Sequence, residues 1–197
     1  MATTKQQADQ EQEEASEDEE VEIQSADFYR RRFYRAKVPE KDSVVKVETT
    51  EIEGLGANVR LLEYGLIEGF IQFNQVSTRR VRSVQKFLKV GRREMMEVLR
   101  VDDAKMYIDL SKKSLMPDGK AEAEKRWKKS KKVHEIMFEL AMKLKVTIES
   151  LYEAWGWDLY DKCGFEHALD ALRVALQDPD IVFSKINISD DVKEKLI

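Results

Sequence analysis

The stretch ANVRLLEYGLIEGFIQFNQVSTRRVRS, residues 57–83, passes abruptly from apolar segments to a basic run. Its first part holds two segments rich in valine, isoleucine, leucine and aromatic residues, ANVRLLEY (57–64) and LIEGFIQF (66–73). Segments of this kind are typical of short β-strands. The stretch therefore predicts two strands that lead into a loop with concentrated positive charge.

Three further segments around this stretch also indicate strands. SVVKVETTEIE (43–53) precedes it and is followed by GLG (54–56), which indicates a turn or bulge. REMMEVLRVD (93–102) and MYIDLSK (106–112) come after it, and DDAK turns the chain between them. Five short strands with a long excursion between the third and the fourth fit a small barrel of the OB type.

From Pro117 onward the pattern becomes helical. Pro117 suits the first turn of a helix, where its missing N–H donor costs least. The segment 121–146 repeats apolar residues at helical spacing on one face, namely Trp127, Val133, Ile136, Met137, Leu140, Ala141 and Leu144. Three more helices are expected in TIESLYEAWGW, FEHALDALRVAL and SDDVKEKLI, the first capped by Thr147 and the last by Ser189. The predicted fold class is α+β, a five-stranded OB-type β-barrel followed by a compact all-α helical domain.

Charge divides the chain into an acidic head and a basic remainder. Residues 1–27 contain ten acidic residues and one lysine, and the formal net charge of the whole chain is −4, so the rest carries about +5. The head has no aromatic residue and too little apolar surface to fold, so we expect a disordered acidic extension. The expected domains are therefore 1–27 as this extension, 28–115 as the S1-type barrel and 116–197 as the helical domain.

Several classes of protein are disfavoured by what the sequence lacks. The head has neither the basic nor the apolar region of a signal peptide, and no apolar run reaches the roughly 20 residues of a membrane span. One cysteine, Cys163, cannot form an intrachain disulfide, which favours a reducing, cytoplasmic location. His134 and His167 are far apart and have no partner at metal-ligand spacing, so ordinary packing at a helix surface or core edge is expected. No catalytic constellation or phosphate-binding glycine loop is recognisable, and we expect neither an enzyme nor a metal site.

The strongest local signal is the basic loop. From Ser77 to Arg93 there are seven lysine or arginine residues and no acidic one, and Arg79, Arg80, Arg82 and Lys86 are the candidate contacts for an RNA backbone. A solvated surface loop is the alternative reading. Asn58 and Gln72 occupy strand positions where rings would strengthen the case for base stacking. A contact with backbone or shape is therefore favoured over sequence-specific binding, and the second basic run, 125–132, is read as an exposed helix face.

Residues 57–83 resemble the first domain of the alpha subunit of eukaryotic translation initiation factor 2. The order LLEY, IEG and then VS-RR-RS is specific to that family. The resemblance extends upstream through RFYRAKVPEKDSVVKV and downstream through VGRREMMEVLRVDDAKMYIDLSKKSLMPD. It reaches the helical part at KKSKKV and ESLYEAWGW and covers most of the chain after residue 27. The family also has a C-terminal α/β domain that holds the gamma subunit, and we expect this chain to lack it.

The resemblance implies that the loop receives a regulatory phosphate. The family's acceptor serine falls on Ser77, where the next residue is Thr78 instead of the usual arginine. Local arginine placement would instead favour Ser83, because Arg79, Arg80 and Arg82 precede it. Phosphorylation at Ser77 is therefore expected from the family, with Thr78 and Ser83 as alternative acceptors.

The family resolves this choice by kinase docking at a remote stretch, KGYID. Here the stretch is KMYID, which assigns Lys105, Tyr107, Ile108 and Asp109 to docking. Met106 replaces the glycine, so a turn that requires positive φ is expected to be altered. The alternative reading of Tyr107 is a surface aromatic residue without a partner.

The resemblance also implies partners and cofactors. The heterotrimer of alpha, beta and gamma subunits carries GTP and initiator methionyl-tRNA to the small ribosomal subunit, and its alpha subunit touches tRNA and mRNA. Its phosphorylated form binds the guanine-nucleotide exchange factor unproductively and slows initiation, and stress-activated protein kinases add the phosphate. No cofactor is expected on this chain, since GTP and magnesium belong to the gamma subunit. Two alternatives remain: a generic RNA-binding OB protein and a pseudosubstrate mimic of the kinases, which the helical domain disfavours.

Overall fold

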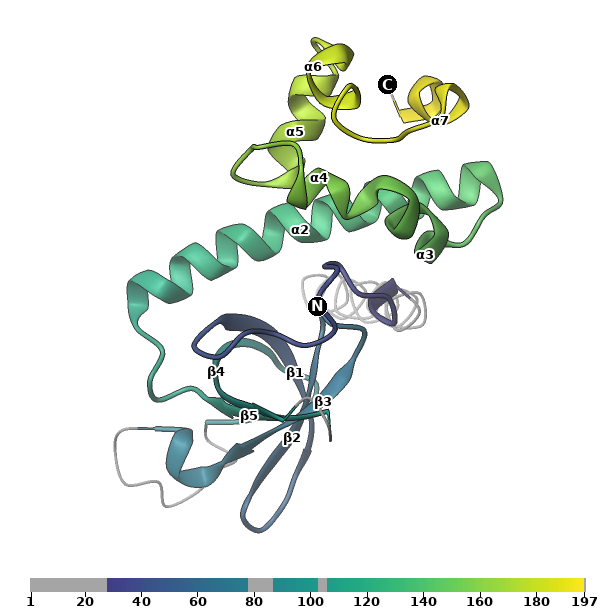
Figure 1. Cartoon of the computed structure of the whole chain (residues 1–197). Helices are drawn as coiled ribbons and strands as arrows, with labels where there is room; N and C mark the ends of the chain where they lie inside the picture. Colours follow the sequence, from purple (N-terminus) through teal and green to yellow (C-terminus); the bar gives the residue numbers. More distant parts are fainter. Residues whose placement is uncertain (1–27, 78–86, 103–105, 197) are drawn as a thin grey trace, which may run out of the picture.

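A computed structural model describes residues 28–77, 87–102 and 106–196 of the chain (Figure 1). The strands are β1 (Val44–Ile52), β2 (Gly56–Leu61), β3 (Ile67–Gln72), β4 (Arg93–Asp102) and β5 (Tyr107–Ser111). A short 3-10 helix, η1 (Phe73–Gln75), follows β3. The helices after the strands are α2 (Pro117–Leu144), α3 (Ile148–Leu151), the π-helical turn η3 (Tyr152–Gly156), α4 (Asp158–Asp161), α5 (Ala168–Ala175), α6 (Pro179–Phe183) and α7 (Asp190–Leu196).

The five strands close into a barrel in the order β1-β2-β3-β5-β4. Four of the pairings are antiparallel, whereas β3 and β5 pair in parallel, with Phe70 opposite Asp109 and Ile71 opposite Leu110. Side chains alternate along the strands, and the inward ones form an apolar core that includes Val47, Val59, Ile71, Val98 and Leu110. The predicted fold class, an OB-type barrel followed by helices, is therefore confirmed.

Close approach of strands explains a glycine inside β3. A Cβ atom added at Gly69 would lie 2.9 Å from a Cδ of Leu110 and 3.2 Å from the carbonyl oxygen of Ile108, both on β5. A side chain at this position would therefore hold β3 and β5 apart. Gly69 permits the parallel pairing that closes the barrel.

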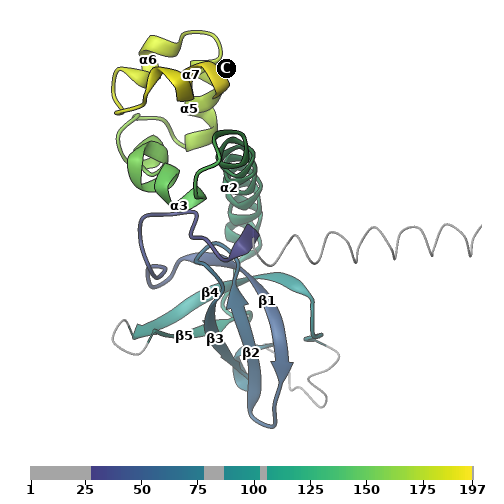
Figure 2. The ribbon, with the colours of Figure 1, turned by 90° about the vertical axis from the view of Figure 1, so that its right-hand side faces the viewer.

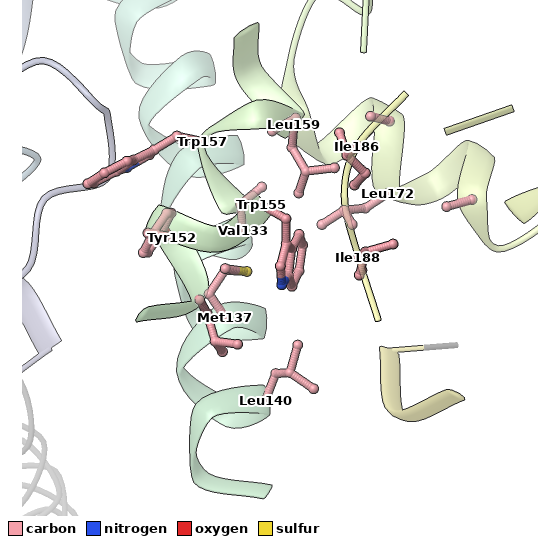
Figure 3. Close-up of a cluster of buried hydrophobic side chains, with 14 of the residues drawn as sticks. Val133, Met137, Leu140, Tyr152, Trp155, Trp157, Leu159, Leu172, Ile186 and Ile188 are labelled. Carbon is pink, nitrogen blue, oxygen red and sulfur yellow. The ribbon is translucent and has the colours of Figure 1, made fainter. Parts of the chain in front are cut away.

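Helix α2 is the longest helix of the second part of the molecule. Helices α5, α6 and α7 lie on its side away from the barrel, whereas α3 lies beside residues 28–35 (Figures 1 and 2). The buried α2 residues Val133, Met137 and Leu140 meet Tyr152, Trp155 and Leu159 in one apolar cluster (Figure 3). Gly156 allows this packing, since a Cβ there would lie 2.6 Å from the Cε of Met137. Lys145 ends α2 in the left-handed conformation, with φ of 56°, and Thr147 caps α3 as predicted by accepting a bond from the N–H of Ser150.

Two predictions about the helices were wrong in detail. The segment 147–157 is not one α-helix, because η3 interrupts it after α3. Helix α6 was not predicted, because the chain after residue 176 was read as a stop. Its signals are present, since the Asp178 side chain accepts a hydrogen bond from the N–H of Asp180 and Pro179 stands in the first turn.

Residues Phe28–Arg35, which we call the N-terminal strap, run between the barrel and α2 (Figure 1). On the barrel side, the N–H of Phe33 donates to the carbonyl of Glu63, and Arg32 forms an isolated bridge with Tyr64. On the helical side, Phe33 stacks against His134 with a centroid distance of 4.1 Å. The strap thus makes one apolar cluster from the barrel and the helix: Tyr29, Phe33, Leu62, Met95, Ala123 and Trp127.

Among the helices of the described segments, none combines the length and the apolar character needed to cross a lipid bilayer.

Candidate regulatory and RNA-contact site

Ser77 stands where the barrel wall gives way to the basic loop. Directly before it, η1 ends and Val76 is buried in the barrel core. The backbone N–H groups of Lys112 and Lys113 both donate to the carbonyl of Gln75, at 3.0 and 2.9 Å. The hydroxyl of Ser111 is 3.1 Å from Oε1 of Gln75. The position two residues before the candidate acceptor is thus held by the end of β5.

The far end of the loop is held by the same part of the barrel. The ammonium group of Lys112 donates to the carbonyl of Phe87 at 3.1 Å and also pairs with Glu94. Leu88 is completely buried in the core. Both ends of the segment 78–86 therefore start from fixed points near the C-terminal end of β5. The predicted sites Thr78, Arg79, Arg80, Arg82, Ser83 and Lys86 lie within that segment, outside the described residues.

The docking stretch lies on β5 itself. Tyr107 is 45% exposed and Asp109 is half-buried, and both face outward, whereas Ile108 is completely buried in the barrel core. Burial raises the pKa of Tyr107, and hydrogen bonding to the Asp109 carboxylate adds to this rise. The side chains of this stretch that face solvent are thus Tyr107 and Asp109, while Lys105 lies outside the described residues.

Met106 shows how the turn before β5 is made. It has a φ of 51°, a left-handed conformation that usually favours glycine. Methionine therefore adopts a positive φ here, a conformation that glycine adopts at lower cost. The side chain, 42% exposed, adds an apolar group beside Tyr107.

Strand β5 carries the predicted docking residues and also contacts the segment just before Ser77. Tyr107 begins β5 and Ser111, which contacts Gln75, ends it. Four residues of extended chain span about 13 Å. A partner that grips Tyr107 and Asp109 would thus find the start of the basic loop at a fixed distance.

An aromatic ring on the outer barrel face was missed from the sequence. Phe70 on β3 pairs with Asn58 on β2 and with Asp109 on β5, and it is not part of the barrel core. A Cβ at Gly56 would lie 2.3 Å from the Cζ of Phe70, so the ring lies directly over that glycine. The outer face therefore carries one half-buried ring next to the polar Asn58.

A chain of polar side chains links the helices to the barrel through the strap. His167 Nε2 lies 3.0 Å from the hydroxyl of Ser130, which lies 2.7 Å from that of Tyr34. The Tyr34 hydroxyl donates to the carboxylate of Glu63 at 2.8 Å. Burial raises the pKa of Glu63 and that of Tyr34. Nothing in the sequence pattern joins these four residues, because they come from four separate segments.

His134 is more deeply buried than the sequence indicated. Its Nε2 lies 2.8 Å from the carbonyl of Phe28, and its Nδ1 lies 2.8 Å from the hydroxyl of Tyr152. A carbonyl can only accept, so Nε2 carries the proton and the Tyr152 hydroxyl donates to Nδ1. Burial lowers the pKa of His134 to about 4, so the ring is neutral near pH 7. The expectation of packing at a surface or core edge was wrong for this histidine.

The described segments contain no group of three or more histidine, cysteine or acidic side chains that could hold a metal ion. Cys163 is buried, and its burial raises the pKa of the thiol. No reactive centre is assembled there. What the described part of the barrel does assemble is a surface, with outward Tyr107 and Asp109 at one end of β5 and the anchored loop at the other.

Comparison with known proteins shows to which proteins the chain is related. Residues 38–113 match the family model described as the S1 RNA binding domain. Over 166 residues the chain is 47% identical to eukaryotic translation initiation factor 2 subunit 1 of Plasmodium berghei, which covers 84% of this chain and 50% of the relative. It is 44% identical over 163 residues to the alpha subunit of Arabidopsis thaliana, with coverage of 83% and 46%. The chain is homologous to the alpha subunit of eukaryotic translation initiation factor 2.

Solved structures agree with this relation to the initiation factor 2 alpha subunits at the level of fold. The intact alpha subunit of aIF2 from Pyrococcus abyssi superposes with a TM-score of 0.73 at 23% identity, over 82% of this chain and 62% of that one. The a/eIF2alpha chain in a complex with aDim2p and rRNA from Pyrococcus horikoshii gives 0.69 at 24% identity, over 81% and 93%. The chain spans about half the length of the curated alpha subunits that it matches.

Proposed function

We propose that this chain acts in translation initiation as the regulatory alpha subunit of initiation factor 2, without catalytic activity of its own. The homology to curated alpha subunits supports this role. In this role it would join the beta and gamma subunits. GTP and magnesium would be held by the gamma subunit, and the complex would bring initiator methionyl-tRNA to the small ribosomal subunit and mRNA.

The proposed regulatory event is the addition of a phosphate to Ser77. The observation that supports it is the arrangement around β5. Ser111 and Lys112 at its end contact residues on both sides of the segment 78–86, and Tyr107 and Asp109 face outward from the same strand. A stress-activated kinase that grips Tyr107 and Asp109 would not depend on arginines placed before its acceptor. This favours Ser77 over Ser83, although local arginine placement alone would favour Ser83.

The phosphate would change how the loop is recognised. It adds about −1.5 to −2 charge at neutral pH and three strong acceptor oxygens. Arg79, Arg80 and Arg82 are near enough in sequence to neutralise it. The guanine-nucleotide exchange factor would then bind the rearranged surface more tightly. A tenfold gain in its affinity needs only about 1.4 kcal/mol, which one or two charge-assisted hydrogen bonds can supply.

The test is phosphosite mapping by mass spectrometry after incubation with a kinase of the type that acts on initiation factor 2. Ser77→Ala should abolish both the modification and the tighter binding of the exchange factor. Ser83→Ala and Thr78→Ala serve as matched controls and should retain both. A phosphate placed mainly on Thr78 or Ser83 would overturn the assignment to Ser77.

A second candidate function is that of a generic RNA-binding OB protein, and Phe70 on the outer barrel face favours it. Stacking of a base on an exposed ring contributes about 1–3 kcal/mol in single-strand binders. Phe70→Ala should then weaken RNA binding with little dependence on salt. If RNA affinity instead follows only the basic side chains, contact with the RNA backbone is the better description.

A further inference from the structure

A polar pocket lies at the junction of the barrel with the start of α2. Its volume is about 410 Å³, and it is lined from three parts of the chain. Strand β1 gives Lys46, and the start of β4 with the residue before it gives Arg92 to Met95. The connection after β5 gives Lys112 and Leu115, and the first turns of α2 give Lys120 and Glu124. The full lining is Lys46, Arg92, Arg93, Glu94, Met95, Lys112, Leu115, Lys120 and Glu124.

Positive charge dominates this lining, with five basic side chains against two carboxylates. Glu94 is shared, since it pairs with Arg92 at 2.9 Å and with Lys112 at 2.8 Å. Arg93 pairs with Glu48 at 2.7 Å, just beyond the lining, and lies over the ring of Tyr29. Arg92 and Lys112 therefore share the carboxylate of Glu94, and Arg93 pairs with Glu48, which does not line the pocket.

Lys46 and Lys120 are the two lining cations that do not take part in these ion pairs. Neither ammonium group comes within ion-pair distance of a carboxylate in the segments that the structure describes. Burial is the main cause that lowers the pKa of Lys46; Glu124 and Glu94 raise it, and Lys120 and Arg93 lower it. The five cations of the lining exceed its two carboxylates, so an anion in the pocket would offset the excess positive charge.

We propose that this pocket binds a phosphodiester group of an RNA backbone, held mainly by Lys46 and Lys120. Lys46, Arg92, Arg93 and Lys112 all lie within the part of the chain that matches the S1 RNA binding domain. The pocket is separate from the basic loop and does not involve Ser77. The inference rests on the proposed function in one respect, namely that RNA is the class of ligand.

This geometry has a consequence for the path of the RNA. A phosphate in the pocket would contact the barrel through Lys46 and helix α2 through Lys120 at the same time. Lys112 also lines the pocket while it holds the carbonyl of Phe87 at the end of the basic loop. One RNA strand could therefore pass from the loop to the junction, with phosphates neutralised at both places.

The test uses the whole chain and a fluorescein-labelled single-stranded RNA, with the Kd measured at several salt concentrations. Lys46→Gln/Lys120→Gln should weaken binding by roughly three- to tenfold at about 50 mM salt and flatten the salt dependence by about one phosphate contact. Lys143→Gln/Lys145→Gln removes the same charge at the far end of α2 and should leave binding unchanged. Circular dichroism and thermal unfolding check that both variants fold.

Further arms separate this inference from the proposed function. If Arg79→Gln/Arg80→Gln weakens RNA binding and the pocket variant does not, the pocket inference is overturned and the RNA contact of the loop stands. If neither variant weakens binding, the RNA contact of the proposed function fails as well. Inorganic phosphate is titrated alone as a third arm. Phosphate binding that the pocket variant abolishes, with RNA binding unaltered, would make this a site for free phosphate and overturn the RNA assignment.

Discussion

Ile108 and Asp109 are neighbours in β5, yet their side chains end in opposite surroundings. Ile108 is completely buried in the barrel core, whereas Asp109 faces outward beside Arg100 and Phe70 in the strand pairings. This difference follows from the alternation of side chains along a strand. It explains why only alternate residues of a docking stretch on β5 can be read by a partner.

Asp109→Asn should lower the rate of phosphorylation at Ser77 without unfolding the barrel. Asparagine keeps the shape but removes the charge, so the loss should be about 1–3 kcal/mol in kcat/KM of the kinase. Steady-state kinetics with purified kinase measures it. Lys41→Gln, an exposed change outside the docking stretch, is the control. Equal kinetics for wild type and Asp109→Asn would remove Asp109 from the docking surface.

His134 predicts a specific loss of stability in mild acid. Its pKa is about 4 in the folded protein and 6.5 in its ordinary state, so the unfolded chain binds the proton first as the pH falls. The stability is fully present above about pH 6.5 and decreases toward pH 4, by about 3 kcal/mol in total for this group. The raised pKa of Glu63 adds stability as the pH falls and so opposes the effect of His134, whereas the lowered pKa of His167 adds to the loss of stability.

Urea unfolding at pH 7 and pH 5 measures this effect. His134→Gln cannot gain a proton but can still donate to the Phe28 carbonyl. Its stability should therefore change less between the two pH values than that of the wild type, whatever its absolute stability. An equal change in both proteins would show that His134 does not cause the acid sensitivity.

At the scale of the element, β5 depends on the turn that precedes it. Met106 holds a positive φ that costs most for a β-branched residue. Met106→Val should destabilise the chain by about 1–2 kcal/mol, whereas Met106→Gly should be neutral or slightly stabilising. Thermal unfolding of the two variants shows which of them is more stable. A Val variant as stable as the Gly variant would mean that this turn carries no backbone strain.

The strands could be predicted because each one has a local signal. Alternation and turn residues indicated all five in their correct order. The closure of the barrel could not be derived in the same way, because the parallel pairing of β3 with β5 depends on Gly69 and on contacts distant in sequence. The π-helical turn after Leu151 likewise reflects packing of Gly156 against Met137, which no local propensity shows.

The candidate site could likewise be predicted only in part, because some of its features depend on contacts distant in sequence. Ser77, Tyr107 and Asp109 follow from a resemblance in sequence, whereas the contact of β5, which carries Tyr107 and Asp109, with the segment before Ser77 depends on the fold. Phe70 was missed because it was counted as a strand residue with no face assigned. The strap residues Tyr34 and Phe33 were missed because the segment 28–35 has neither helical nor strand periodicity, and their partners Ser130 and His134 lie about 100 residues later.

At the scale of the whole molecule, Phe33 joins the two parts. It is completely buried and stacks on both His134 and Trp127. Phe33→Ala should lower the free energy of unfolding by about 3–5 kcal/mol, as for other buried aromatic residues. Tyr107→Ala removes an exposed ring and should cost far less. Urea unfolding followed by tryptophan fluorescence compares the two, and similar losses would mean that the strap does not hold the parts together.

The strap also imposes an order on events during synthesis. Phe28 bonds to a side chain 106 residues later, and Arg35 pairs with residues 123 and 126 positions later. A nascent chain presents residues from the N-terminus first, so the barrel can close as soon as residue 111 has emerged. Phe28, Tyr29 and Phe33 then remain without their partners Trp127 and His134 until α2 has been synthesised. The strap residues are therefore synthesised first but are among the last to reach their final positions. During that interval they expose an apolar surface that a chaperone would bind.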